Sequence, residues 1–174
     1  MHPILLYDGV CGLCNRLVQF ILRRDPAGIF RFASLQSPLA GRILARHGAD
    51  AQDLDTVYVV VNADQADEQL LARSDAVIFI LGQLGEAELR SARPGLRPGP
   101  TQGTPTPAPT PTPGPAGERG SIFWRLAGFL LRLVPRPVRD WGYRVIARNR
   151  YRMFGRYDAC PMPTEETRRR FLDL

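Results

Sequence analysis

The sequence predicts a small α/β domain that is followed by a helical extension. In the first 90 residues, short apolar runs typical of buried strands alternate with segments whose apolar residues recur every three to four positions, as they do in helices. A proline-rich segment then separates this part from a second region of helical periodicity. The total length of 174 residues is enough for one ordinary domain with an appendage.

Two steps of strand and helix begin the expected domain. Residues 4–7 form a short apolar run, which is typical of a buried strand, and residues 13–24 place four apolar side chains on one helical face. A turn that contains proline and glycine precedes a second apolar run over residues 29–33. A proline at its first position and a glycine just past its end predict a helix over residues 38–47.

A hairpin and a closing helix complete the domain. The β-branched residues of segment 56–61 predict a strand, and residues 69–73 can pair back on it. A serine and an aspartate are expected to cap a helix over residues 76–84, which a glycine at position 85 ends. The resulting order, β-α-β-α-β-β-α, predicts a sandwich built around a mixed sheet of four strands.

A linker and a helical extension are expected after this domain, which takes residues 1–90. Residues 91–120 contain 9 prolines, 6 glycines and 5 threonines, a composition that cannot form a core and predicts a disordered linker. Residues 121–174 form the extension, with one amphipathic helix over residues 122–134 and another over residues 138–150. We expect these helices to pack on the domain or on one another. The side chains expected to be available for burial in the second helix are Trp141, Val145 and Ile146.

The net charge of +6 is concentrated in the extension. Residues 121–157 carry nine arginines and one acidic residue, whereas residues 1–90 carry more acids than arginines. Arginine near Phe123 and Trp124 suits an anionic membrane surface, which is one expectation for this segment, and a solvated or packed helical surface is the other. We expect no specific nucleic acid partner. Without a visible targeting signal or an apolar run long enough to span a bilayer, we expect a cytoplasmic protein, peripheral at the membrane if the extension binds lipid.

Cys11 and Cys14 form a C-x-x-C pair at the exit of the first strand and the beginning of the first helix. Residues three apart in a first helical turn lie on one side, so the two sulfurs can close a short disulfide. Unpaired N–H groups and the helix dipole stabilise a thiolate there, which makes Cys11 the expected nucleophile and Cys14 the resolving thiol. Asp8 is expected to shape the preceding turn and tune the thiol pKa, or to move protons during exchange.

Other functions fit parts of this pattern. A C-x-x-C pair is also half of a zinc site, but only Cys160 remains for a second pair, so such a site would require His2, His47 or an acid. A second alternative is a module without enzyme activity that binds a membrane or a partner through the arginine-rich extension. Thiol-disulfide exchange needs no metal or organic cofactor, and its substrate is a protein or small-molecule disulfide or thiol.

The segment Asp8-Gly9-Val10-Cys11-Gly12-Leu13-Cys14 resembles the opening D-G-x-C-x-x-C of the DCC-type thiol-disulfide oxidoreductases. The resemblance continues over residues 73–76, 147–156 and 170–172 and at Cys160, on both sides of the expected linker. It implies a thioredoxin-like fold and redox activity on protein disulfides or small thiols. The proline-rich insert is longer than the usual connection in that family.

The same resemblance raises the question of where substrate binds. Thioredoxin-like proteins usually place a cis-proline before the third strand, facing the active disulfide, and this chain has no proline there. Asp55 and Thr56 take its place and are the candidate substrate-binding residues, although they can equally be an ordinary strand start. Cys160 is expected to be a buried or incidental thiol rather than a third redox partner.

Overall fold

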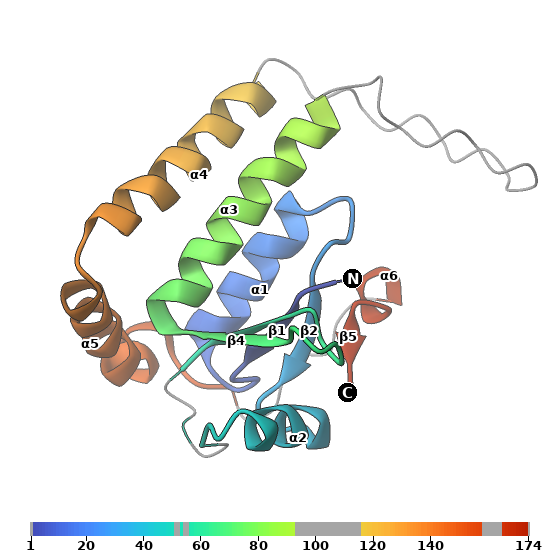
Figure 1. The fold of residues 1–174 in the computed structure, drawn as a ribbon, viewed down its shortest axis with the longest axis vertical. Helices are drawn as coiled ribbons and strands as arrows, with labels where there is room; N and C mark the ends of the chain where they lie inside the picture. The colour runs from blue at the N-terminus through green and yellow to red at the C-terminus, as the bar shows by residue number, and fades with distance from the viewer. Residues whose placement is uncertain (1, 51–52, 54–55, 93–115, 158–164, 174) are drawn as a thin grey trace, which may run out of the picture.

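A mixed sheet of five strands lies at the centre of the computed structural model, which describes residues 2–50, 53, 56–92, 116–157 and 165–173 (Figure 1). The strand order is β4-β3-β1-β2-β5. The strands are β1 (Ile4–Tyr7), β2 (Arg31–Ser34), β3 (Tyr58–Val61), β4 (Gln69–Ala72) and β5 (Phe171–Leu172). β1 runs parallel to β2 and antiparallel to β3, and β4 runs antiparallel to β3. This topology confirms the α/β class and is consistent with a thioredoxin-like fold.

Helices cover both faces of the sheet (Figure 1). They are α1 (Gly12–Arg24), α2 (Pro38–Arg46), α3 (Arg73–Ala92), α4 (Ala116–Leu133), α5 (Arg136–Phe154) and α6 (Glu165–Arg168). Because successive side chains of a strand point to opposite faces, Leu5 and Tyr7 join the core under α1 and α3, while Leu6 joins the core under α2. β1 is therefore buried on both faces, and its carboxyl end leads directly into the cysteine motif.

The ends of the first two helices follow from local chemistry. Cys11 occupies the N-cap of α1, and the Ser37 hydroxyl caps α2 by accepting from the Ala40 N–H at 3.2 Å. Pro38 takes the first position of α2, as predicted. Gly48 follows that helix with a φ of 62°, a conformation that glycine adopts without steric cost.

The third helix is longer than the sequence predicts. It begins at Arg73 and runs to Ala92, so Gly85 does not end it. Gly85 is buried within α3, against which α4 packs along its length, and this tertiary contact outweighs the weak helix propensity of glycine. Together α3 and α4 extend into both ends of the expected linker. The rest of that linker, residues 93–115, lies outside the described residues.

The two helices of the extension pack on the domain, and the buried face of the second helix differs from the expected one. α4 packs on α3 through the side that carries Gly128, whose position for a Cβ is 3.8 Å from Leu81 Cβ. α5 packs on α1 and α3 and buries Ala147 and Arg150. The prediction that Trp141, Val145 and Ile146 supply the buried face of this helix is wrong, because all three are exposed.

A fifth strand was not expected. Near the end of the chain, β5 pairs parallel to β2, where the Phe32 N–H donates to the Arg170 carbonyl at 2.9 Å. The guanidinium of Arg170 binds the buried carboxylate of Asp25, and the rings of Phe32 and Phe171 lie 5.1 Å apart. The extension is therefore not only helical, since it also supplies one edge of the sheet. None of the helices in the described ranges is long and apolar enough to cross a membrane.

Candidate active site

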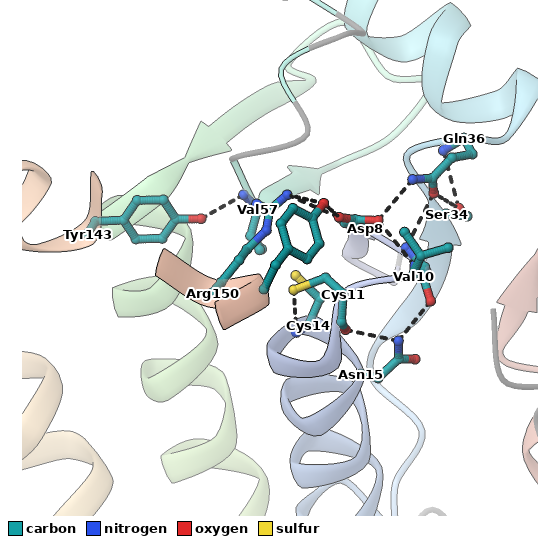
Figure 2. Close-up of polar contacts among 12 residues, drawn as sticks. Asp8, Val10, Cys11, Cys14, Asn15, Ser34, Gln36, Val57, Tyr143 and Arg150 are labelled. Carbon is teal, nitrogen blue, oxygen red and sulfur yellow. Dashed lines mark hydrogen bonds and ion pairs between the residues drawn. The ribbon is translucent and has the colours of Figure 1, made fainter. Parts of the chain in front are cut away.

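The two cysteines of the motif meet at the amino end of α1 (Figure 2). The Cys14 backbone N–H lies 3.5 Å from Cys11 Sγ, so the sulfur of the N-cap residue accepts the hydrogen bond that a serine hydroxyl makes elsewhere. Asn15 fixes the same turn, because its side-chain amide donates to the Gly9 carbonyl at 2.8 Å and to the Cys11 carbonyl at 3.0 Å. Both cysteines are free thiols and are buried.

The surroundings shift the pKa values of the two thiols in opposite directions. The Cys14 thiol, which donates to Cys11 Sγ, contributes most to lowering the pKa of Cys11 from 9.0 to about 6, against an opposing effect of burial. Backbone N–H groups of the first turn and the positive charge of Arg150 lower the pKa of Cys11 further. The same hydrogen bond, burial and the negative charge of Cys11 raise the pKa of Cys14. The site therefore holds one thiolate and one thiol side by side near neutral pH.

Asp8 connects the motif to the C-terminal part of the chain. Its fully buried carboxylate accepts from the Val10 N–H at 3.1 Å and from Gln36 Nε2 at 2.9 Å. The Arg150 guanidinium donates to it at 3.0 Å, and the Tyr151 hydroxyl donates to the same oxygen, Oδ2. A carboxylate with this many donors is held in one position. Asp8 thus fixes α5, and with it the charge of Arg150, beside the two sulfurs.

A short segment after α5, which we call the C-terminal strap (residues 155–157), crosses the cysteine motif. The Gly12 N–H donates to the Gly155 carbonyl at 3.1 Å, and the Tyr157 N–H donates to the Val10 carbonyl at 2.8 Å. A Cβ atom at Gly12 would lie 2.1 Å from the carbonyl oxygen of Phe154, so only glycine permits this approach. Cys11 is 0% exposed, because the strap and other neighbouring residues surround it.

Tyr143 of α5 forms a hydrogen bond with the loop before β3. The Tyr143 hydroxyl accepts from the Val57 N–H at 2.8 Å (Figure 2), and burial together with the charge of Cys14 raises the pKa of Tyr143 to about 12. Thr56 is buried and its hydroxyl donates to Asp53 at 2.9 Å. The other candidate substrate-binding residue, Asp55, lies outside the described residues.

The described part of the chain has no group of three His, Cys, Asp or Glu side chains close enough to hold a metal ion. A zinc site on Cys11 and Cys14 would therefore need a ligand from the residues that are not described. Cys160, which is expected to be a buried or incidental thiol, is one of these residues.

Sequence reasoning found the cysteines and Asp8 but not their supporting side chains. Gln36, Tyr143, Arg150 and Tyr151 all contact this site from distant parts of the chain. The sequence did contain a signal for Arg150 and Tyr151, because both lie in residues 147–156, one of the segments that carry the family resemblance. Arg150 of this segment forms an ion pair with Asp8, which attaches the C-terminal part of the chain to the first domain.

Comparisons with known proteins show which family this chain resembles. The family model described as DCC1-like thiol-disulfide oxidoreductase matches residues 5–101. The uncharacterized protein YuxK of Bacillus subtilis is 33% identical over 171 residues, which cover 98% of this chain and 94% of that protein. A DCC family protein of Arabidopsis thaliana, named as chloroplastic, is 31% identical over 161 residues, covering 92% of this chain and 70% of that protein. No solved structure gives a significant match.

Proposed function

Because the chain belongs to the DCC1-like thiol-disulfide oxidoreductase family, we propose that it exchanges thiols and disulfides through its C-x-x-C pair, with Cys11 as the nucleophile and Cys14 as the resolving thiol. The observation that carries this assignment is the opposite shift of the two pKa values at the amino end of α1. A thiolate is the attacking species in disulfide exchange, and a thiol with a pKa near the ambient pH attacks fastest.

In the first step the Cys11 thiolate attacks one sulfur of a substrate disulfide. A bond forms between Cys11 Sγ and that sulfur, the substrate S–S bond breaks, and the second substrate sulfur leaves as a thiolate that takes a proton from solvent. The hydrogen bond from the Cys14 thiol and the charge of Arg150 hold Cys11 ionised before this step.

The second step uses a change in the environment of Cys14. The hydrogen bond to the Cys11 thiolate and its negative charge are two of the causes that raise the pKa of Cys14, and both are lost once Cys11 is bound in the mixed disulfide. Arg150 and the backbone N–H of Asp8, which lower the pKa of Cys14, remain. Cys14 then loses its proton and attacks Cys11 Sγ. The mixed disulfide breaks as the Cys11–Cys14 disulfide forms, and the substrate sulfur leaves as a thiolate that takes up a proton. Two electrons and two protons have then passed to the substrate.

Access to Cys11 requires the C-terminal strap to move, because the strap covers the backbone on both sides of that residue. The Val10 carbonyl and the Gly12 N–H that bind the strap are an acceptor and a donor arranged as in a β-bridge. An extended peptide beside a substrate disulfide can make the same two hydrogen bonds in place of the strap. This favours a protein disulfide over a small one as substrate.

A trapping experiment tests the proposal. In a Cys160→Ser background, which removes the third thiol, the Cys14→Ser variant should accumulate mixed disulfides through Cys11 with a reducible protein substrate, and turnover should stop. The matched Cys11→Ser variant should trap nothing. Adducts that form equally on Cys11→Ser, or full turnover by either variant, would contradict the assignment.

A further inference from the structure

The outer sides of α4 and α5 carry many large apolar side chains that no described part of the chain covers. On α4 these are Phe123, Leu126, Phe129, Leu130 and Leu133, each more than half exposed. On α5 the corresponding side chains are Val138, Trp141, Val145, Ile146 and Met153. We call these ten side chains the apolar face. Exposed apolar surface on this scale marks a site of interaction with a membrane or another protein.

The apolar face packs against none of the described elements of the fold. The helical spacing of Phe129 and Leu133 puts them on the side of α4 away from Gly128, which contacts α3. α5 uses Ala147 and Arg150 for its own packing. Only Val134 and Pro135 separate the two helices, which lie on one side of the molecule, away from β5 and α6 (Figure 1).

Positive charge accompanies the apolar face. Arg144, Arg148 and Arg152 are exposed on α5, and none of them has an acidic partner among the described residues. The arginines of α5 that do form ion pairs face the domain instead, where Arg136 and Arg139 bind Asp75. Asp140, the acid within α5, accepts a hydrogen bond from Ser74 on α3.

A cavity on the outer side of α5 is lined by both apolar and positively charged side chains. It has a volume of about 180 Å³ and is lined by Trp141, Arg144, Val145 and Arg148. Two guanidinium groups one helical turn apart, beside an indole ring, suit the phosphate of a lipid headgroup whose acyl chains meet the apolar side chains.

We propose that the apolar face binds the surface of an anionic phospholipid membrane, with α4 and α5 lying in the plane of the interface. Leucine, phenylalanine and tryptophan enter the boundary between headgroups and acyl chains, and the exposed arginines bind lipid phosphates. A membrane fits this face better than a protein partner does, because the exposed charged side chains of α5 are all arginines and complement anionic lipid. Arg150, which contacts the redox site, is buried, whereas Trp141, Arg144 and Arg148 are exposed on α5, so binding through these three leaves the proposed chemistry intact.

Vesicle sedimentation with the full chain tests this proposal. The protein should bind vesicles of phosphatidylcholine with phosphatidylglycerol, and should bind neither phosphatidylcholine alone nor the mixed vesicles at high salt. The variant Arg144→Gln/Arg148→Gln should bind about 30-fold more weakly, since each arginine near an anionic surface contributes roughly a fivefold effect. The variant Phe129→Ser/Leu133→Ser should bind roughly tenfold more weakly or worse.

A variant with the same loss of charge elsewhere is the control. Arg23→Gln/Arg42→Gln removes two exposed arginines from α1 and α2 and should bind as the parent protein does. A second readout comes from the Trp124→Phe variant, in which Trp141 is the one remaining tryptophan and its emission should shift to shorter wavelength on binding. Circular dichroism checks that each variant is folded.

Three results would overturn the proposal. The first is no binding to the anionic vesicles, and the second is equal weakening by the α5 variant and the control. The third is a dimer in sedimentation equilibrium that Phe129→Ser/Leu133→Ser dissociates without changing vesicle binding, which would make the apolar face a contact between copies of this chain. None of these results depends on the cysteines, so the proposal fails or stands separately from the redox function.

Discussion

Arg150 Nη2 lies 3.0 Å from Asp8 Oδ2, although 142 residues separate the two in the chain. The Asp8 side chain is 0% exposed and that of Arg150 is 3% exposed. This buried ion pair joins the end of β1 to α5 directly beside the cysteine motif. It places a positive charge near Cys11, and it makes the position of the C-terminal strap depend on a residue at the amino end of the chain.

The Asp8–Arg150 pair should couple strongly in a double-mutant cycle. Asp8→Asn and Arg150→Gln should each lower the free energy of unfolding by about 3–5 kcal/mol, because each leaves a buried charge without its partner. The double variant should lose clearly less than the sum of the two. Urea denaturation measures all three values, and losses that simply add would show that the two residues act independently.

Glycine at position 12 should control access to Cys11. In Gly12→Ala the new Cβ meets the Phe154 carbonyl oxygen, so the C-terminal strap must move away from the motif. The rate at which a small disulfide reagent modifies Cys11 should rise, and stability should fall. Gly82→Ala is the control, because its Cβ meets nothing within 4 Å, and it should leave reactivity unchanged and stabilise α3 by about 0.5–1 kcal/mol. Equal reactivity of the two variants would mean that the strap does not limit access.

The attachment of β5 should depend on Arg170. Its guanidinium binds the carboxylate of Asp25, which is fully buried and also accepts from the Ile29 and Phe30 N–H groups at 2.9 Å each. Arg170→Gln should therefore lower the free energy of unfolding by about 3 kcal/mol. The control Arg168→Gln removes an exposed contact with Glu165 and should cost about 1 kcal/mol or less. Thermal unfolding compares the two, and equal losses would contradict a structural role for the Arg170 contact.

The parts of the fold that local patterns determine could be predicted from the sequence. The position of α1 and the N-terminal place of Cys11 follow from an apolar strand, a turn and a helical period within 24 residues. β5 could not be found this way, because two residues carry no periodicity and their pairing with β2 depends on a contact across the whole chain. The length of α3 also escaped prediction, since α3 packs on α4 and buries Gly85, and this tertiary packing outweighs a local stop signal.

In the candidate site, too, local sequence patterns predict some residues, and only long-range contacts reveal the others. The motif itself supplied Asp8, Cys11 and Cys14, whose roles depend on near neighbours. Arg150 contributes through a three-dimensional contact that spacing does not reveal, although its segment carried a family resemblance. The apolar spacing of α4 correctly indicated a helix but gave no information about which side of it faces solvent. Only the packing on α3 decides that.

Thiolate absorbance against pH, measured on the reduced protein in a Cys160→Ser background, tests the assignment of Cys11 most directly. Folding lowers the pKa of Cys11, so its thiolate should persist as the pH falls below 9 and disappear with a midpoint near pH 6. Arg150→Gln should raise that midpoint. Cys14→Ser should keep a low midpoint, because a serine hydroxyl also donates to the sulfur, whereas Cys11→Ser should show no thiolate near neutral pH. A low midpoint that survives in Cys11→Ser and is lost in Cys14→Ser would contradict the proposed roles of the two cysteines.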